Sequence, residues 1–287
     1  MTTTKSRLGQ ALSNGRLAIT AECLPPRAAD AAAVKKLSAD LPPNLDAVVV
    51  PDNPHEIHGS ALACAAILAR EGRESVLSMV TRDRNRIALE SDALGAAALG
   101  VGAILSLSGD HQSLGVSPQA AGVYDIDSIQ FTQALKTMAL PDLLLGAVAH
   151  PYMKPMELGL IRLRKKIAAG ADFVFTQAVF DVPGFTRWME AVRAAGLDKQ
   201  VAILASVLPL TSVEKAKALD ERQTYGPVGE KVIARLSGAS DVAKEGVAIA
   251  AEMAAQLKSV PGVRGIHILS GGCESLAAAV IKEAELA

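Results

Sequence analysis

The sequence has few aromatic residues, few cysteines and almost no net charge, and each shortage argues against a class of protein. Aromatic residues make up 3% of the 287 residues, so stacking on a flat ligand depends on a few rings or on aliphatic side chains. Cys23, Cys64 and Cys273 are too few and too scattered for a disulfide framework or a zinc-finger spacing, which predicts reduced, mostly structural cysteines. The formal net charge of -1 gives no indication of binding to nucleic acid or to an anionic membrane.

Several common signals are also missing. No long apolar run follows the basic residues near the N-terminus, so we expect no signal peptide, no membrane span and a cytoplasmic location. Walker A, HExxH and GxSxG motifs are absent, and the partial GxG of Gly100 and Gly102 precedes an apolar run instead of following one, which argues against a Rossmann phosphate loop. His55 and His58 could share a helical face, but such histidines are usually polar surface, and we predict no metal site.

The sequence does contain a repeated alternation of short apolar runs and helical patterns. The apolar runs predict eight strands, at residues 17–22, 47–50, 75–80, 103–107, 143–149, 173–176, 201–207 and 265–269. Helices are predicted at 29–39, 60–70, 85–99, 127–138, 158–169, 183–195 and 212–219, with extra helices at 229–236 and 242–258 before the last strand and a final one at 274–285. Strands alternating with helices predict an α/β protein with a parallel sheet, and eight units predict closure into a (β/α)8 TIM barrel. An open doubly wound sheet is the alternative. Because no linker interrupts the pattern, we expect a single domain over residues 1–287.

Polar or turn-forming residues follow every apolar run. A barrel gathers the carboxyl ends of its strands around one mouth, so these residues would share one site. Capping and turns could explain most of them separately, but not Gln177 or His150 within apolar sequence, where an unpaired polar group costs about 1–3 kcal/mol. In chain order the residues are Glu22, Pro51-Asp52-Asn53, Thr81-Arg82-Asp83, Ser108-Gly109-Asp110, His150-Pro151, Gln177, Leu208-Pro209-Leu210 and Ser270-Gly271-Gly272.

Two of these features have competing explanations. At Gly109 the backbone could approach a ligand closely and present Asp110 at the end of a strand, or the pair could form a glycine turn followed by an acidic helix cap. A basic group in the fifth helix includes Arg162 and Lys166, which are four residues apart and share one face. That face is either a clamp for a diphosphate or a solvated surface.

Three short segments and two longer ones carry a family resemblance. AECLPPR (21–27), SGD (108–110) and FTQAVFD (175–181) are similar to the E-F-F-P-P-R, R-G-D and T-Q-x-x-F-D motifs of methylenetetrahydrofolate reductases of the bacterial, flavin-dependent type. TRDRNRIALESDALGAAALG and GDHQSLGVSPQAAGVYDIDSIQ are closer still to a subgroup from the one-carbon pathways of anaerobic and methyl-group-metabolising bacteria. The similarity runs in register from Ala18 to Leu269.

The resemblance implies FAD at the barrel mouth and interconversion of 5,10-methylenetetrahydrofolate and 5-methyltetrahydrofolate by hydride transfer. Glu22 matches the general acid that protonates N10 and opens the substrate ring, and the apolar residues 23–25 offer a setting that would raise its pKa. Asp110 matches the acid that binds the pterin amino edge and stabilises the developing cation. Gln177 matches the pterin-binding glutamine, which presents a donor and an acceptor together.

Other residues match flavin-contacting positions of the family. Lys166, with Lys165 and Arg162, falls where the family contacts the FAD phosphates. The full set implied at the cofactor is Asp52, Ser108, Gly109, Asp110, Tyr124, Asp125, His150, Arg162, Lys165 and Lys166.

The sequence departs from the family at several functional positions, and His150 lies near the family's flavin-contacting tyrosine. Ser108 replaces an arginine beside the flavin, Leu219 replaces a phenylalanine that stacks on the folate, and Lys215 replaces a glutamine of the substrate site. The electron donor is therefore open between NAD(P)H and a partner subunit, and homo-oligomerisation is equally open. The alternative function is a flavin-free barrel that binds folate or transfers a methyl group, or a subunit of a larger reductase complex. An aldolase-like lyase ranks third, because no strand end offers a suitable Schiff-base lysine.

Overall fold

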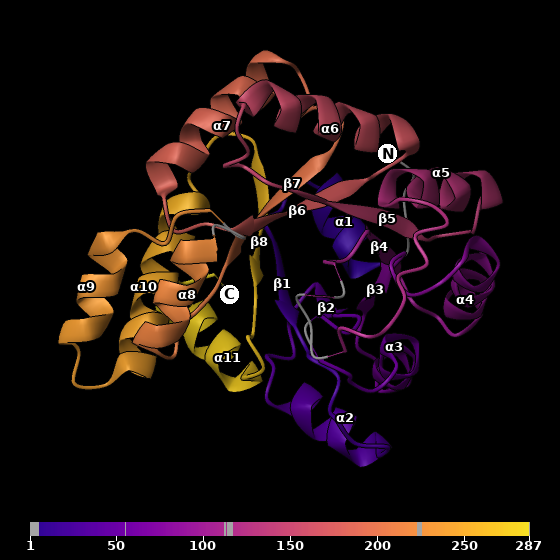
Figure 1. Ribbon diagram of the computed structural model, residues 1–287, viewed down its shortest axis with the longest axis horizontal. Helices are drawn as coiled ribbons and strands as arrows, with labels where there is room; N and C mark the ends of the chain where they lie inside the picture. Colours follow the sequence, from indigo (N-terminus) through magenta and orange to yellow (C-terminus); the bar gives the residue numbers. More distant parts are fainter. Residues whose placement is uncertain (1–5, 55, 112, 114–116, 223–225, 287) are drawn as a thin grey trace.

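Eight parallel strands form a closed barrel in the computed structural model, which describes residues 6–54, 56–111, 113, 117–222 and 226–286. Each strand pairs with its neighbours in the sequence, and β8 closes the barrel by pairing with β1 (Figure 1). The strands are β1 (Ala18–Glu22), β2 (Ala47–Val50), β3 (Ser75–Val80), β4 (Ala103–Leu107), β5 (Leu144–Ala149), β6 (Phe173–Ala178), β7 (Ala202–Val207) and β8 (Val263–Ile268). The predicted TIM barrel is confirmed, and the doubly wound alternative is excluded because the sheet has no edge.

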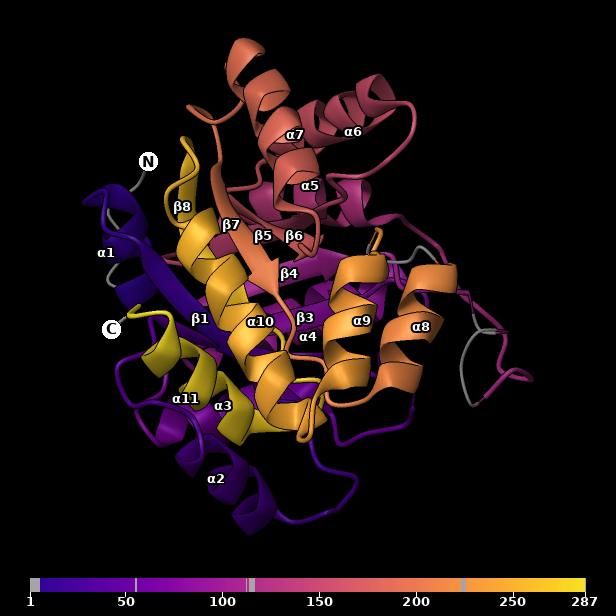
Figure 2. The same ribbon diagram turned by 90° about the vertical axis from the view of Figure 1, so that its left-hand side faces the viewer.

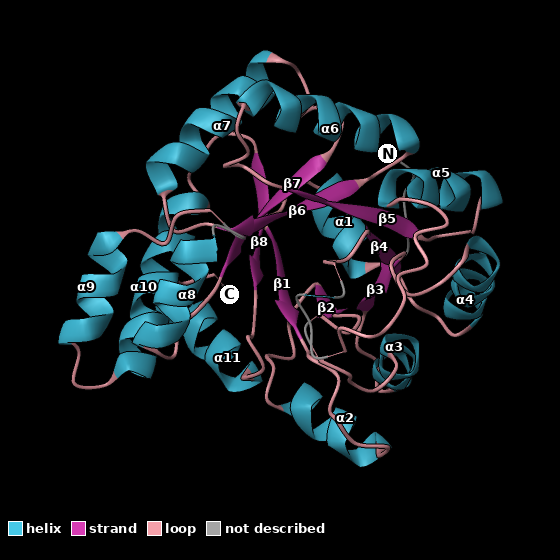
Figure 3. Cartoon of the chain, in the orientation of Figure 1, coloured by secondary structure: helices cyan, strands magenta, loops and turns pink. Residues whose placement is uncertain are grey.

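Helices cover this barrel around its wall and, for the first helix, at one end (Figure 3). They are α1 (Arg7–Ser13), α2 (Ala31–Ala39), α3 (Ala61–Arg70), α4 (Arg86–Ala98), α5 (Ser128–Met138), α6 (Met156–Ala169), α7 (Val182–Ala194), α8 (Val213–Arg222), α9 (Glu230–Gly238), α10 (Val242–Leu257) and α11 (Glu274–Glu283). The extra helices predicted before the last strand are α9 and α10. No helix in the described part of the chain is long and apolar enough to cross a membrane.

Helix α1 was not predicted from the sequence, and it closes the amino-terminal end of the barrel. Leu8, Ala11 and Leu12 lie on one face of α1 and pack against the inward side chains at the start of the strands. Glu74 lies just before β3, and its carboxylate accepts hydrogen bonds from the first two backbone N–H groups of α1, those of Arg7 and Leu8. The distance from the Leu8 nitrogen to Oε1 of Glu74 is 3.2 Å. In Figure 2, α1 lies at the left edge, at one end of the barrel. The interior of the barrel is therefore closed at the amino-terminal ends of the strands.

Side chains inside the barrel become more polar along the strand direction. Inward residues alternate along each strand, so Phe173 and Phe175 of β6 lead to Gln177, and Ala18 of β1 leads to Thr20 and Glu22. The layers near the amino-terminal ends of the strands form an apolar cluster with α1. At the carboxyl ends, polar side chains such as Glu22 and Gln177 lie beside the apolar Val80, Leu107 and Val148.

Candidate functional site

A cavity of about 330 Å³ opens at the carboxyl ends of the strands. This volume is at the lower end of the range of about 300–1,000 Å³ found for small-molecule sites. Glu22 at the end of β1, Asp110 after β4 and Gln177 in β6 all line this cavity. Residues far apart in the sequence therefore share one site because each lies at the same end of its strand. The other lining residues that are not apolar are Asp52, Asn53, Ser78, Arg82, Ser108, Gly109, Ser128, Arg162, Lys166, Thr176, Ser206 and His267.

Glu22 is the last residue of β1, and its carboxyl group is desolvated at the cavity wall. The backbone N–H of Ser270 donates to its Oε2 atom at 3.1 Å. Burial raises the pKa of Glu22 to about 7, against the opposing effect of the N–H donors from the loop after β8. Glu22 is therefore a carboxyl group that exchanges a proton near neutral pH, as the apolar residues that follow it predicted.

Asp110 is presented to the cavity by main-chain contacts. Its carbonyl oxygen accepts from Nη1 of Arg82 at 3.1 Å and from the hydroxyl of Tyr124 at 3.3 Å. Arg82 follows β3, and its nearly buried guanidinium also donates twice to the Asp83 carboxylate, at 2.8 Å each, and to the carbonyl oxygen of Asn53 at 3.3 Å. Arg82 thus joins the loops after β2, β3 and β4, and it leaves the exposed carboxylate of Asp110 free to face a ligand.

Gly109 allows the chain to turn tightly between Ser108 and Asp110. Its φ angle is +81°, which L side chains rarely adopt. A Cβ atom built on Gly109 would lie 2.4 Å from Cγ1 of Val80 and 3.1 Å from Cβ of Arg82. The backbone of the β4 loop can pack on β3 only because no side chain stands at position 109.

Gln177 lies within β6, although the sequence pattern predicts a strand that ends at Thr176. The pairing of β6 with β7 shifts register between Phe175 and Ala178. At this irregularity the hydroxyl of Thr176 donates to the carbonyl oxygen of Gln177 at 2.9 Å and accepts from the N–H of Ser206 at 3.0 Å. Such bulges redirect side chains next to functional sites, and here the bulge leaves Gln177 at the cavity wall.

Two cations of the basic group in α6 line the cavity. Lys166 is buried, and its Nζ atom donates to the carbonyl oxygen of Val148 at 2.5 Å. Burial, assisted by the nearby charge of Arg162, lowers the pKa of Lys166 to about 8. Arg162 lies one turn earlier on the same face, whereas Lys165 is exposed and does not line the cavity. Two cationic side chains of α6 therefore lie at one side of the mouth.

The floor of the cavity is polar, and sequence reasoning did not identify it. His267 of β8 is buried; its Nδ1 atom is 3.0 Å from the hydroxyl of Thr20, and its ring stacks on Phe175 at 4.3 Å. Burial lowers the pKa of His267 to about 3, so the ring is neutral at physiological pH. The hydroxyl of Ser206 is fully buried and has no hydrogen-bond partner among the described residues. An unsatisfied buried hydroxyl in a cavity wall is suited to a polar ligand.

Asp52 and Ser108 line the cavity but already have structural contacts. Asp52 is buried, forms an ion pair with Arg84 and accepts from the N–H of Val80 at 3.0 Å. Burial raises its pKa despite the charge of Arg84. The hydroxyl of Ser108 lies 3.1 Å from that of Ser128 and accepts the Ser128 N–H at 3.3 Å, which fixes the start of α5.

Several residues predicted from the family resemblance lie outside the main cavity. Asp125 is engaged by Arg86 through two side-chain hydrogen bonds, and His150 lines a side hollow that shares Arg162 and Lys166 with the cavity. Lys215 is exposed on α8, and Leu219 packs against the hydrophobic core. The residues absent from the main cavity lining are Tyr124, Asp125, His150, Lys165, Lys215 and Leu219.

No cluster of three or more His, Cys, Asp or Glu side chains in the described residues could hold a metal ion. His55 lies outside the described residues, and His58 bonds the carbonyl oxygen of Pro25 at 2.7 Å through Nδ1. The three cysteines form no disulfide. Burial raises the pKa of Cys23 to about 12, so this thiol stays protonated beside the site.

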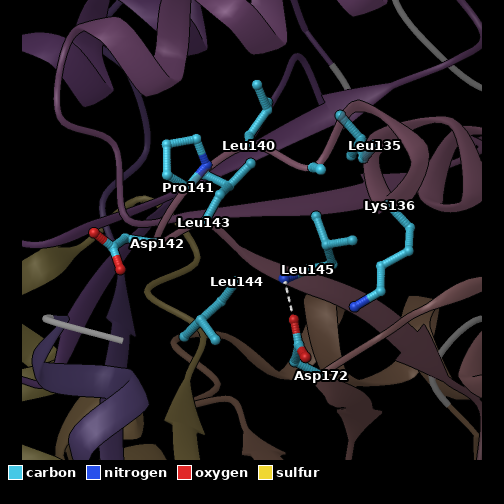
Figure 4. A pocket seen from close by; sticks show the side chains of 10 residues that line it. Leu135, Lys136, Leu140, Pro141, Asp142, Leu143, Leu144, Leu145 and Asp172 are labelled. Atoms are coloured by element: carbon cyan, nitrogen blue, oxygen red, sulfur yellow. Dashed lines mark hydrogen bonds between the residues drawn. The ribbon is translucent and has the colours of Figure 1, made fainter. Parts of the chain in front are cut away.

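A second hollow of about 330 Å³ lies at the opposite end of the barrel, before β5 and β6 (Figure 4). Asp172 and Lys136 point into it, and Asp172 accepts the backbone N–H of Leu145 at 2.9 Å. Chemistry in barrels of this fold is built at the carboxyl ends of strands, whereas the amino-terminal face contributes to stability. We therefore assign the functional site to the cavity at the mouth.

Arg82 was predicted only as one of the polar residues that follow the strands, and the cavity-lining Ser78, Ser128, Thr176, Ser206 and His267 were not predicted. Arg82 was visible in the Thr81-Arg82-Asp83 segment after the third strand, but nothing in its position distinguished it from a turn residue. His267 stands at an alternating position of the last strand, which is the signal for an inward side chain. The contacts that place Arg82 and His267 in the site are made with residues from other strands or from the loops that follow them.

A model of the family described as methylenetetrahydrofolate reductase matches residues 7–285 of the chain. This match covers every strand of the barrel and all residues that line the mouth. The chain belongs to the methylenetetrahydrofolate reductase family. The family assignment agrees with the resemblance inferred from the motifs and places the chain in folate metabolism.

Curated members of the methylenetetrahydrofolate reductase family resemble the chain over most of its length. The 5,10-methylenetetrahydrofolate reductase of Pectobacterium carotovorum is 28% identical over 220 residues, which cover 74% of this chain and 71% of that protein. The enzyme of the same name from Salmonella typhimurium is 27% identical over 222 residues, covering 74% and 72%. Among solved structures, an uncharacterised Clostridium thermocellum protein that binds two copies of 5-methyl-5,6,7,8-tetrahydrofolic acid has the same fold, with a TM-score of 0.69, 16% identity and coverage of 98% and 100%.

Proposed function

We propose that this family member is a flavin-dependent oxidoreductase that interconverts 5,10-methylenetetrahydrofolate and 5-methyltetrahydrofolate at the barrel mouth. The observation that carries the proposal is the meeting of Glu22, Asp110 and Gln177 on one cavity, with a pKa of about 7 at Glu22. The Clostridium thermocellum protein of the same fold binds 5-methyl-5,6,7,8-tetrahydrofolic acid, which supports a folate as the ligand here.

Glu22 serves as the proton donor in this proposal. The methylene substrate accepts a hydride poorly while its five-membered ring is closed, so N10 must be protonated to open the ring. A carboxyl group with a pKa of about 7 keeps a substantial protonated fraction at neutral pH, whereas an ordinary glutamate has almost none. The N–H of Ser270 stabilises the carboxylate that remains after the proton has moved.

Asp110 and Gln177 bind and orient the pterin. The exposed carboxylate of Asp110 accepts hydrogen bonds from the amino edge of the ring, and its charge favours the cation that forms when the substrate ring opens. The Gln177 amide presents one donor and one acceptor, which matches the adjacent carbonyl and N–H groups of a pterin. Because Arg82 fixes the main chain at Asp110, the carboxylate is oriented before the substrate arrives.

The residues at the mouth fit FAD as the cofactor. Arg162 and Lys166 present cations at one side of the cavity, where a diphosphate would be held. Gly109 has no side chain, so a ligand can approach the backbone closely at the rim of the cavity. Arg82 supplies a cation near Asp110, where Ser108 stands at the position of the family's arginine. When bound, FAD would supply the two-electron chemistry between the electron donor and the folate. NAD(P)H or a partner protein would be that donor.

An absorption spectrum of the purified full-length protein tests the proposal. The protein, incubated with FAD and freed of excess cofactor, should retain a yellow flavin spectrum. Anaerobic addition of 5-methyltetrahydrofolate should bleach it, and addition of NADH beforehand tests the donor. A colourless protein that still binds 5-methyltetrahydrofolate but takes up no FAD would overturn flavin dependence and favour the flavin-free folate barrel.

Two matched variants assign the proton donor. Glu22→Gln removes the transferable proton with little change of size, so folate turnover should fall at least about a hundredfold while binding is retained. Glu190→Gln makes the same change at an exposed position of α7 and should have no effect. Folate turnover by Glu22→Gln at the wild-type rate would remove Glu22 as the acid.

A further inference from the structure

We propose that Glu274, a buried carboxylate at the start of α11, is a positioning residue that keeps the Glu22 carboxyl protonated and holds the chain behind it. This inference rests on the proposed role of Glu22 as proton donor. Glu274 touches neither substrate nor cofactor in this proposal; it acts through Glu22.

Two hydrogen bonds join the end of β1 to the segment that leads from β8 into the first residue of α11. One is donated by each segment. The N–H of Ser270 donates to Oε2 of Glu22 at 3.1 Å, and the N–H of Leu24 donates to Oε1 of Glu274 at 3.0 Å. Each segment therefore supplies one carboxylate and one backbone donor to the other. Because Leu24 is two residues beyond Glu22, the Glu274 contact determines how the chain leaves β1 and so where the Glu22 side chain points.

Glu274 is buried at 3% exposure, and none of the salt bridges in the described residues involves it. Its place at the first residue of α11 explains how a carboxylate without a cation is tolerated, since the amino-terminal end of a helix favours negative charge. A second carboxyl group nearby cannot ionise without repulsion from the first. Burial is the larger cause of the raised pKa of Glu22, and the charge of Glu274 raises it further.

The other charged side chains that line the cavity with Glu22 are not among the causes of its raised pKa; they are Asp52, Arg82, Asp110, Arg162 and Lys166. From β8, His267 is uncharged because burial lowers its pKa to about 3. Just after β1, the Cys23 thiol stays protonated. In the loop after β8, the N–H groups of Ser270 and Gly271 lower the pKa of Glu22 instead of raising it. Among the described side chains, Glu274 is therefore the charged group that favours the protonated form of Glu22.

Substitution by glutamine separates the two roles of Glu274. Glu274→Gln keeps an oxygen that accepts the Leu24 N–H but removes the negative charge. Glu274→Ala removes both, and it leaves the Leu24 N–H without its acceptor. Glu283→Gln is the matched control, because Glu283 lies at the exposed end of the same helix.

The experiment is a pH titration of Glu22 in the ligand-free full-length protein, followed by the infrared carbonyl band of its protonated carboxyl group. Glu22→Gln identifies the band by its loss. The wild-type midpoint should lie near pH 7, where the pKa of Glu22 stands. In Glu274→Gln the midpoint should move to lower pH by about one unit, and in Glu283→Gln it should stay. An unchanged midpoint in Glu274→Gln would overturn the proposal, and so would failure of this variant to fold, because the amide retains the Leu24 hydrogen bond.

Folate turnover provides a second readout. The protonated fraction of Glu22 falls tenfold per pH unit above its pKa, so the alkaline decline of turnover should begin about one unit lower in Glu274→Gln than in wild type. Circular dichroism checks that both variants are folded. A wild-type protein without folate turnover would contradict the proposed function, whereas the ligand-free titration would still decide the role of Glu274.

Discussion

Arg82 and Asp110 follow neighbouring strands, and Nη1 of Arg82 lies 3.1 Å from the main-chain carbonyl oxygen of Asp110. Nε and Nη2 of the guanidinium donate to the Asp83 carboxylate, and Nη2 also donates to the carbonyl oxygen of Asn53. One buried side chain therefore fixes three adjacent loops at the mouth. Only the backbone of Asp110 is used in this contact, so its carboxylate remains available.

Replacement of Arg82 by methionine should loosen the loop that presents Asp110. The variant keeps much of the side-chain volume but loses every hydrogen bond, and we expect a loss of about 1–3 kcal/mol in the free energy of unfolding. Affinity for 5-methyltetrahydrofolate should fall at least about tenfold, since Asp110 is no longer held in place. Urea denaturation and calorimetric titration measure the two effects.

Arg235→Met is the control for this prediction. Arg235 is likewise an arginine with several hydrogen bonds, but it pairs with the carboxylates of Glu245 and Glu252 on the outer surface at α9 and α10. Exposed ion pairs contribute about 0–1 kcal/mol, so this variant should lose little stability and no folate affinity. Equal folate affinities in the two variants would contradict the role given to Arg82.

Gly109→Ala should destabilise the protein more than Gly100→Ala. Both glycines have positive φ, +81° and +82°, so both variants incur backbone strain of about 1 kcal/mol. Only at Gly109 would the new Cβ lie 2.4 Å from a Val80 methyl group; at Gly100 no atom lies within 4 Å. We expect an additional loss of about 1–3 kcal/mol for Gly109→Ala, measured by urea denaturation.

A second substitution, at Val80, distinguishes the steric clash of the new Cβ from the backbone strain at position 109. In the double variant Gly109→Ala, Val80→Ala, the Cγ1 atom that the new Cβ would meet is absent. Its loss of stability should therefore be smaller than the sum of the two single losses. Strict additivity would mean that the predicted collision does not occur.

Glu22 should make the protein less stable as the pH rises. Its pKa is raised from 4.5 to about 7 in the fold, so its contribution is complete below pH 4.5 and is lost as the pH rises through 7. The stability of wild type relative to Glu22→Gln should therefore fall by up to about 3 kcal/mol between pH 5 and pH 8. Urea denaturation of both proteins at several pH values measures the difference, and a constant difference would contradict the raised pKa.

His267 should have the opposite pH dependence. Its pKa is lowered from 6.5 to about 3, so its contribution is complete above pH 6.5 and is lost as the pH falls toward 3. In nitrogen-15 NMR spectra of the folded protein at pH 5, the His267 ring should remain neutral, whereas an exposed histidine is protonated. A His267 ring that titrates near pH 6.5 in the folded protein would show that it is not buried as described.

Most of the barrel could be predicted from the sequence. All eight predicted strands are present with ends within two residues of their predicted positions, because buried parallel strands form unbroken apolar runs bounded by turn residues. Helix α1 was missed because it is short; its Leu8, Ala11 and Leu12 pattern is significant only once the open end of a barrel is known to need closing.

The sequence alone determined the fold class, the family and the set of polar residues at the strand ends, since all of these follow from local pattern and motif order. Tertiary structure decided which of them share the cavity. Lys165 and Lys166 are neighbours in the sequence, yet only Lys166 lines the cavity, because adjacent residues of a helix point in different directions. The contacts of Arg82 with Asp110, of Ser270 with Glu22 and of Glu274 with Leu24 join segments from different strands, and only closure of the barrel brings such segments together.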